Sequence, residues 1–204
     1  MRIPDRDRCR SAIAALCLAV VLIAAPAFAL SAEYRILPNG TSFQGEIEVK
    51  NAERYQFTES GMLGEKIPVQ VTGVSLAGNC FPCCFTWQDR STISFPAGNY
   101  TVRFTGIVRD NHLVVAYPEQ YNVTMVIPEG LDVRSRFLGM ISPGGEVSES
   151  KDGNLVVTWK ETRSAEVRYY PPERENLLIW FGQFWVIIAV VLLLPFFLMR
   201  SRKE

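Results

Sequence analysis

The residues best suited to chemistry are three cysteines within one short segment, Cys80, Cys83 and Cys84. In an oxidising exterior, a local disulfide would leave one thiol over, and that odd thiol could instead pair with another chain. A metal-binding or thiol-redox site is a third interpretation, because thiolates are both nucleophiles and zinc ligands. The C-x-x-C spacing suits redox motifs, but the segment lacks their βαβ setting and supplies only sulfur ligands. Simple burial of free thiols is the fourth interpretation, and the sequence leaves all four open.

The chain has one histidine, His112, in the run Arg109-Asp110-Asn111-His112. A polar site formed with Asp110 is one interpretation of this run, and a polar turn between strands is the other. A single histidine excludes most His-based zinc sites and makes a Ser-His-Asp arrangement depend on one residue. The scattered carboxylates show no pairing of glycosidase type, and no Gly-rich phosphate loop is present. We therefore expect no enzymatic activity and no cofactor.

Residues 1–29 predict a secretory signal. Four arginines lie among the first ten residues, residues 11–25 are apolar, and Ala27-Phe28-Ala29 has the small-x-small form of a cleavage site. Cleavage is expected after Ala29. An uncleaved N-terminal anchor is the alternative, because the apolar stretch is long for a signal.

Residues 177–199 predict one transmembrane helix. These 23 residues carry no charge, and a helix of that length reaches about 34 Å, enough to cross an apolar core of about 30 Å. Aromatic residues cluster toward its outer end, and Arg200, Arg202 and Lys203 follow it directly. Since positive residues stay on the cytoplasmic side, the tail 200–204 is expected inside and the preceding domain outside.

Two features near this span concern partners. Residues 171–176 form a short linker stiffened by two prolines, so the outer domain and whatever it binds are expected at the membrane surface. Gln183 lies inside the span, where an amide could bind a partner helix. The favoured interpretation is that Gln183 lies near the interface and contacts water.

The region 30–170 predicts a mostly β extracellular domain, because apolar and polar residues alternate over short stretches. The stretches are 46–50, 55–57, 67–72, 100–105, 123–127, 155–160 and 167–169. Turn-forming residues separate them, at Asn39-Gly40, 96–99, 128–130, 143–145 and Asp152-Gly153. This spacing predicts an antiparallel β-sandwich-like domain, with a division into two small β modules near Arg109 as the alternative.

Three asparagines, Asn39, Asn99 and Asn122, begin Asn-x-Thr triplets, which are acceptors for N-glycosylation. Of the 21 basic and 21 acidic residues, seven and three lie in the two ends, which leaves 14 and 18 in the middle. A mildly acidic outer domain does not suggest a nucleic-acid binder, which normally carries a basic patch.

The last 100 or so residues resemble a known family. The similar segments are 109–112, 121–124, 127–134, 138–145, 173–177 and 183–185. They resemble a family of archaeal single-span surface proteins that is known only as a domain of unknown function. The resemblance implies an exported archaeal, more narrowly euryarchaeal, protein, and it implies no activity and no site residues.

These observations predict a membrane-anchored extracellular β domain. We expect it to act as a binding or structural module, or as an accessory subunit of another membrane or envelope protein. A thiol-redox or metal-binding function of Cys80, Cys83 and Cys84 is the alternative. The oligomeric state is left open.

Overall fold

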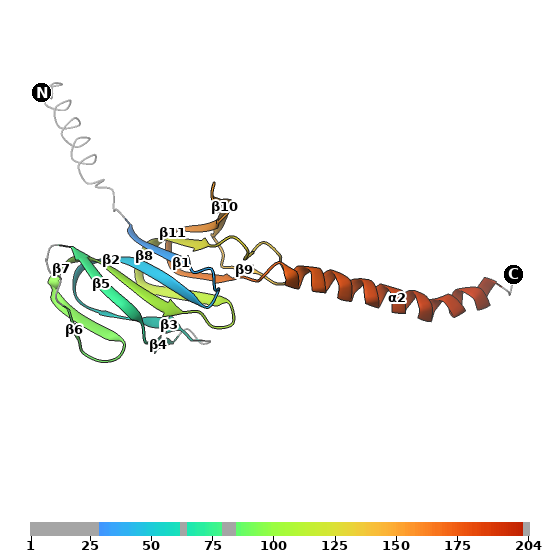
Figure 1. Cartoon of the computed structure of the whole chain (residues 1–204), viewed down its shortest axis with the longest axis horizontal. Helices are drawn as coiled ribbons and strands as arrows, with labels where there is room; N and C mark the ends of the chain where they lie inside the picture. The colour runs from blue at the N-terminus through green and yellow to red at the C-terminus, as the bar shows by residue number, and fades with distance from the viewer. Residues whose placement is uncertain (1–28, 62–64, 79–84, 202–204) are drawn as a thin grey trace, which may run out of the picture.

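The structure is a computed structural model that describes residues 29–61, 65–78 and 85–201. Over these ranges the chain is mostly β, with one long C-terminal helix, as predicted (Figure 1). The strands are β1 (Leu30–Ile36), β2 (Ser42–Gln56), β3 (Thr58–Ser60), β4 (Lys66–Pro68), β5 (Thr72–Gly78), β6 (Thr86–Trp87), β7 (Thr92–Ile107), β8 (His112–Ile127), β9 (Met140–Ile141), β10 (Glu146–Glu149) and β11 (Leu155–Arg168), and the helix is α2 (Glu173–Ser201).

One large sheet holds most of the strands, in the order β10-β11-β8-β1-β2-β7-β5. β6 also pairs with β7, β9 also pairs with β11, and β3 and β4 form a separate two-stranded hairpin. Neighbouring strands are antiparallel, as predicted, except that β1 runs parallel to β8. The sheet is therefore mixed, and β1 lies between two strands that are far from each other in the sequence.

Four long strands, β2, β7, β8 and β11, give the sheet its two layers. Each strand has 14 to 16 residues. Near the middle of each strand, the alternation of buried and exposed side chains is interrupted. The register of β2 shifts between Val49 and Arg54, and that of β11 shifts between Trp159 and Ser164. Such irregularities bend a strand and increase its twist, so the sheet folds over onto itself.

The two layers enclose one continuous core. Its largest fully buried side chains include Trp159, Tyr169 and Phe57. The Tyr169 hydroxyl donates a hydrogen bond of 2.7 Å to the carbonyl oxygen of Gly40, which joins the end of β11 to the turn after β1. The core therefore belongs to one domain and is not divided into two modules near Arg109.

The predicted turns have different outcomes. Turns are present at Asn39-Gly40, at 128–130, at 143–145 and between β10 and β11, where Gly153 has a φ of 76°. Residues 96–99 are not a turn, since they form the bend inside β7. The predicted strand at 67–72 is also interrupted, because β4 ends at Pro68 and β5 begins at Thr72.

The run Arg109–His112 is a tight turn between β7 and β8. Asp110 and Asn111 have φ of 53° and 54°, as both central residues of a type I′ turn do. The backbone N–H of His112 donates to the carbonyl oxygen of Arg109 at 2.9 Å. The turn interpretation of these four polar residues is therefore confirmed.

The helix α2 extends away from the sheet (Figure 1). Residues Glu173–Leu194 are long and apolar enough to cross a membrane, and none of this surface is buried by the rest of the protein. The helix begins at Glu173, so most of the expected linker 171–176 is helical. The predicted signal lies outside the described residues, apart from Ala29.

Candidate functional site

A cavity of about 1440 Å³ opens between the second half of β2 and the first half of β8, beside the β3–β4 hairpin. We call it the β2–β8 groove. Successive residues line it on both sides, at 54–56 on β2 and 113–119 on β8. Because successive side chains of a strand point to opposite faces, this pattern means that each strand presents its edge to the groove.

Each of these strand segments has one paired side. Residues 52–56 of β2 pair with β7, and residues 112–116 of β8 pair with β11. β3 lies alongside the start of β8, but among the described strands neither segment pairs with another strand on its second side. An unpaired edge offers backbone N–H and C=O groups to an added strand.

Aromatic side chains form the floor of the groove. They are Tyr34, Phe43, Tyr55, Phe57, Phe104, Tyr117 and Tyr121. The rings of Tyr117 and Tyr121 stack with centroids 4.3 Å apart. The Tyr117 hydroxyl donates to the Tyr34 hydroxyl at 2.9 Å, and the Tyr121 hydroxyl donates to the carbonyl oxygen of Glu48 at 2.9 Å.

These phenols are held in the neutral form. Burial raises the pKa of Tyr34, Tyr55 and Tyr117 well above the ordinary value. Neighbouring tyrosines raise the pKa of Tyr34 and Tyr55 further, whereas the hydrogen bond to Tyr34 lowers that of Tyr117. Burial, with smaller contributions from the charges of Glu119 and Glu48, raises the pKa of Tyr121 to about 12. None of the described residues hydrogen-bonds to the Tyr55 hydroxyl. It is therefore a neutral donor that a ligand in the groove can meet.

Charged side chains of both signs line the upper walls, among them Lys50, Arg54, Lys66 and Glu119. The Arg109 guanidinium lies 3.8 Å from the carboxylate of Glu59, which links the β7–β8 turn to the hairpin. Mixed charges above an aromatic floor suit a ligand that is itself both polar and apolar, such as a peptide segment.

His112 does not form the polar site with Asp110 that was one interpretation of the sequence. Its Nε2 lies 2.6 Å from Oε1 of Glu166, on the neighbouring strand β11. The sequence carried no signal for this partner, because the pair depends on the register of β8 against β11. The described residues also contain no group of three His, Cys, Asp or Glu side chains that could hold a metal ion.

The cysteines Cys80, Cys83 and Cys84 lie outside the described residues. Their segment connects β5 with β6, and both of these strands pair with β7. Gln183 lies on the exposed surface of α2.

The three candidate glycosylation sites are all exposed, and each asparagine also binds the backbone. Asn39 Oδ1 accepts from the N–H of Thr41 at 3.1 Å, within the β1–β2 turn. Asn99 Oδ1 accepts from the N–H of Asn51 at 3.0 Å, and Asn122 Oδ1 from the N–H of Glu161 at 3.1 Å.

The contacts of Asn99 and Asn122 have the same form. Their partners, Asn51 and Glu161, have φ of 48° and 50° and lie at the bends of β2 and β11. Each asparagine thus satisfies a backbone N–H at a position where the sheet ladder is interrupted. Sequence reasoning missed this role, since it follows from which strands are neighbours. A glycan would attach to Nδ2, so these Oδ1 contacts and glycosylation are compatible.

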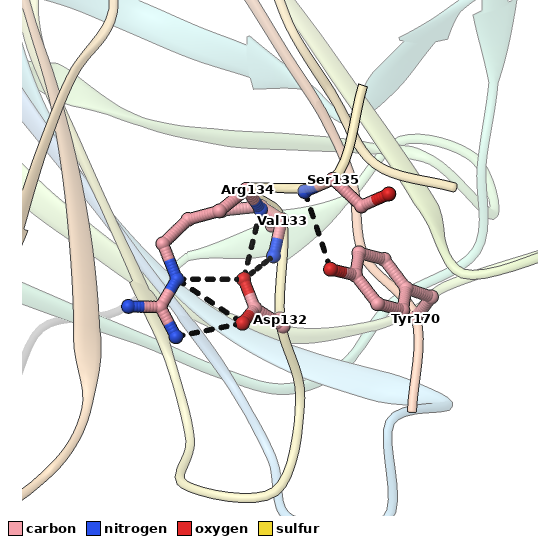
Figure 2. A network of polar contacts seen from close by, with 5 residues as sticks. All are labelled: Asp132, Val133, Arg134, Ser135 and Tyr170. Atoms are coloured by element: carbon pink, nitrogen blue, oxygen red, sulfur yellow. Dashed lines mark hydrogen bonds and ion pairs between the residues drawn. The ribbon is translucent and has the colours of Figure 1, made fainter. Parts of the chain in front are cut away.

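A second polar network lies where the domain meets α2 (Figure 2). Asp132 accepts from the backbone N–H groups of Val133 and Arg134 and from the Arg134 guanidinium, with a shortest ion-pair distance of 2.7 Å. The Tyr170 hydroxyl accepts from the N–H of Ser135 at 3.2 Å. Asp132 and Tyr170 also exchange two backbone hydrogen bonds of 2.9 Å. We call these contacts the helix-root clamp, because Tyr170 lies three residues before the helix.

The hydrogen bonds and charge of Arg134, together with the backbone N–H groups, hold the pKa of Asp132 below its ordinary value. The carboxylate is therefore ionised at neutral pH and binds the loop that follows it.

Comparison with known proteins assigns the chain to a family. No curated protein matches the sequence. A family model described as "Family of unknown function (DUF5803)" matches residues 83–201, which include β8, the helix-root clamp and α2. Because this match covers more than half of the 204 residues, the chain belongs to this family of unknown function, DUF5803.

Proposed function

We propose that the chain is a single-span surface protein of an archaeon. In this proposal residues 1–29 are a signal, 30–170 an extracellular domain, 177–199 the membrane span and 200–204 a cytoplasmic tail. The exposed apolar surface of α2 and the basic residues that follow it support the span and its orientation. The resemblance of the C-terminal half to archaeal surface proteins supports the source.

The extracellular domain, in this proposal, is a non-enzymatic binding module, and the β2–β8 groove is its binding site. The observation that carries this is the pair of strand edges that line an aromatic floor. An extended peptide segment that adds to one edge would gain main-chain hydrogen bonds, and the pocket between the strands would select its side chains. The Tyr55 hydroxyl and the charged walls would fix its register.

The partner in this proposal is another membrane or envelope protein. Tyr170 is the last residue joined to the β domain by a backbone pair, and it lies three residues before α2. The domain therefore stays close to the membrane. An accessory subunit would meet such a partner at two places, with its groove outside and with Gln183 on the helix. Replacing Gln183 with leucine should then weaken co-purification while groove binding persists.

Photo-crosslinking in intact cells tests the groove. A benzoylphenylalanine placed at Arg54, exposed beside the groove, would be compared with one at Lys160, exposed at the bend of β11. The proposal expects one recurrent peptide from a membrane or envelope protein, crosslinked from position 54 and lost in Tyr55→Ala. Equal products from positions 54 and 160, or products that persist in Tyr55→Ala, would refute the groove as the binding site.

A further inference from the structure

Phe137 is the most exposed large apolar side chain outside α2 in the described part of the chain, at 87%. It lies in a tight turn, 135–139, closed by a hydrogen bond of 2.8 Å from the N–H of Gly139 to the carbonyl oxygen of Ser135. A phenylalanine side chain that stays in water forgoes the free energy that its burial would gain. The exposed Phe137 side chain is therefore a candidate contact with a partner surface.

The helix-root clamp fixes this turn relative to α2. Ser135, the first residue of the turn, donates its N–H to the Tyr170 hydroxyl (Figure 2). Asp132 also pairs with the backbone of Tyr170. On the other side of the turn, Met140 in β9 pairs with Arg168 in β11. The turn is thus held from both sides against the residues that lead into the helix.

The turn is also compact. Gly139 lies so close to the backbone of Val133 that a Cβ at this position would clash with it. A compact turn with two points of attachment holds Phe137 in a defined place relative to the residues that lead into α2. The exposed side chain of Arg136 lies next to it in the chain, whereas Arg134 is paired with Asp132.

We propose that the Phe137 turn rests in the headgroup layer of the membrane that α2 crosses. This inference rests on the proposed span. Phenylalanine is favoured at the boundary between headgroups and acyl chains, and the neighbouring Arg136 can bind a lipid phosphate. One aromatic side chain would bind a bilayer weakly by itself, but the helix keeps the turn at high effective concentration beside it. The contact fixes the orientation of the β domain relative to the membrane, and therefore the angle between the β2–β8 groove and the membrane surface.

The test uses the full chain in lipid nanodiscs. A solvatochromic amino acid would replace Phe137, and the matched control would carry the same probe at Ala97, which is exposed on the bend of β7. Both samples would be measured with ordinary lipids and with lipids brominated near the top of the acyl chains. Because Phe137 is almost fully exposed, its replacement should not disturb folding.

The expected result is a blue-shifted emission at position 137, quenched by the brominated lipid, and an unshifted, unquenched emission at position 97. The native Trp180 and Trp185 report on the helix in the same samples. If these tryptophans are quenched and position 137 is not, the inference about the turn is wrong while the span holds. If neither is quenched, the span itself is wrong, and the inference falls with it.

Discussion

The Tyr117 hydroxyl donates a hydrogen bond of 2.9 Å to the Tyr34 hydroxyl, and this bond joins β8 to β1 beneath the groove. These strands are the parallel pair of the sheet. Tyr117→Phe should lower the free energy of unfolding by about 1 kcal/mol, because a buried hydroxyl loses its partner. The measurement is urea unfolding of the full chain in detergent.

Two comparisons sharpen this prediction. The double variant Tyr34→Phe/Tyr117→Phe should lose less free energy of unfolding than the two single variants lose together, because the two hydroxyls share one hydrogen bond. Tyr55→Phe is the matched control, since no described residue bonds its hydroxyl, and its stability should be nearly unchanged. If the free-energy losses of the Tyr34 and Tyr117 variants were strictly additive, this would contradict the hydrogen bond between them.

The neutral tyrosines predict how stability depends on alkaline pH. The pKa of Tyr121 and that of Tyr169 are raised to about 12 by burial, whereas an unfolded tyrosine titrates near pH 10. The folded chain therefore binds more protons than the unfolded chain between these values. The contribution of these tyrosines to stability should be constant below about pH 10 and fall as the pH rises toward 12.

Urea unfolding at pH 8 and pH 11, together with tyrosinate absorbance, measures this effect. Tyr121→Phe should reduce the loss of stability between the two pH values. Equal stability at pH 8 and pH 11 would show that the groove tyrosines ionise without unfolding, and it would contradict their burial.

Local patterns predicted much of the fold. Alternation such as that around Ile47 predicted strands, and Asp152-Gly153 predicted the turn that lies between β10 and β11. The uncharged run 177–199 predicted a helix able to cross a membrane. Residues 96–99 were wrongly predicted as a turn, because a proline and a glycine mark a strand bend as readily as a chain reversal.

The groove could not be predicted, because it depends on which strands are neighbours. The parallel pairing of β1 with β8 brings together residues about 90 positions apart, as in the pair Leu30 and Tyr121. Periodicity shows which face of a strand is buried but not which strand lies beside it. The same limit concealed the pair of His112 with Glu166 and the bend contacts of Asn99 and Asn122.

Asn122 offers a test that separates its structural role from glycosylation. In protein expressed without glycosylation, Asn122→Ala should lower the free energy of unfolding by about 1 kcal/mol, because the N–H of Glu161 loses its acceptor. Thr124→Val is the control for the triplet, since it abolishes the acceptor sequence and keeps the Asn122 contact. An effect as large in Thr124→Val would contradict the role of the asparagine at the bend.

The positive φ at the same bend predicts a stabilising change. Glu161 has a φ of 50°, a conformation that is strained for a residue with a Cβ. Glu161→Gly should therefore raise the free energy of unfolding by a few tenths to about 1 kcal/mol. Thermal unfolding checks this, with Glu149→Gly in β10 as the control expected to destabilise.

The helix-root clamp predicts a dependence on acid pH. The pKa of Asp132 is lowered, chiefly by the hydrogen bonds from Arg134, so the unfolded chain takes up the proton at a higher pH than the folded chain does. The stabilisation that ionised Asp132 contributes is therefore present above about pH 4. It is lost as the pH falls through the pKa of Asp132 in the folded chain. Asp132→Asn should destabilise the chain at pH 7, and this effect should shrink as the pH falls below about 4.

Glu33→Gln is the matched control for Asp132→Asn. Glu33 pairs with Arg35 at 3.1 Å, but both side chains are more than half exposed. Such surface pairs contribute little to the free energy of unfolding. Because Asp132 and Ser135 hold the Phe137 turn to Tyr170, the Asp132→Asn variant should also weaken the lipid quenching of a probe at position 137. A variant that loses stability at pH 7 and keeps that quenching would show that the turn is positioned by β9 instead of by the clamp.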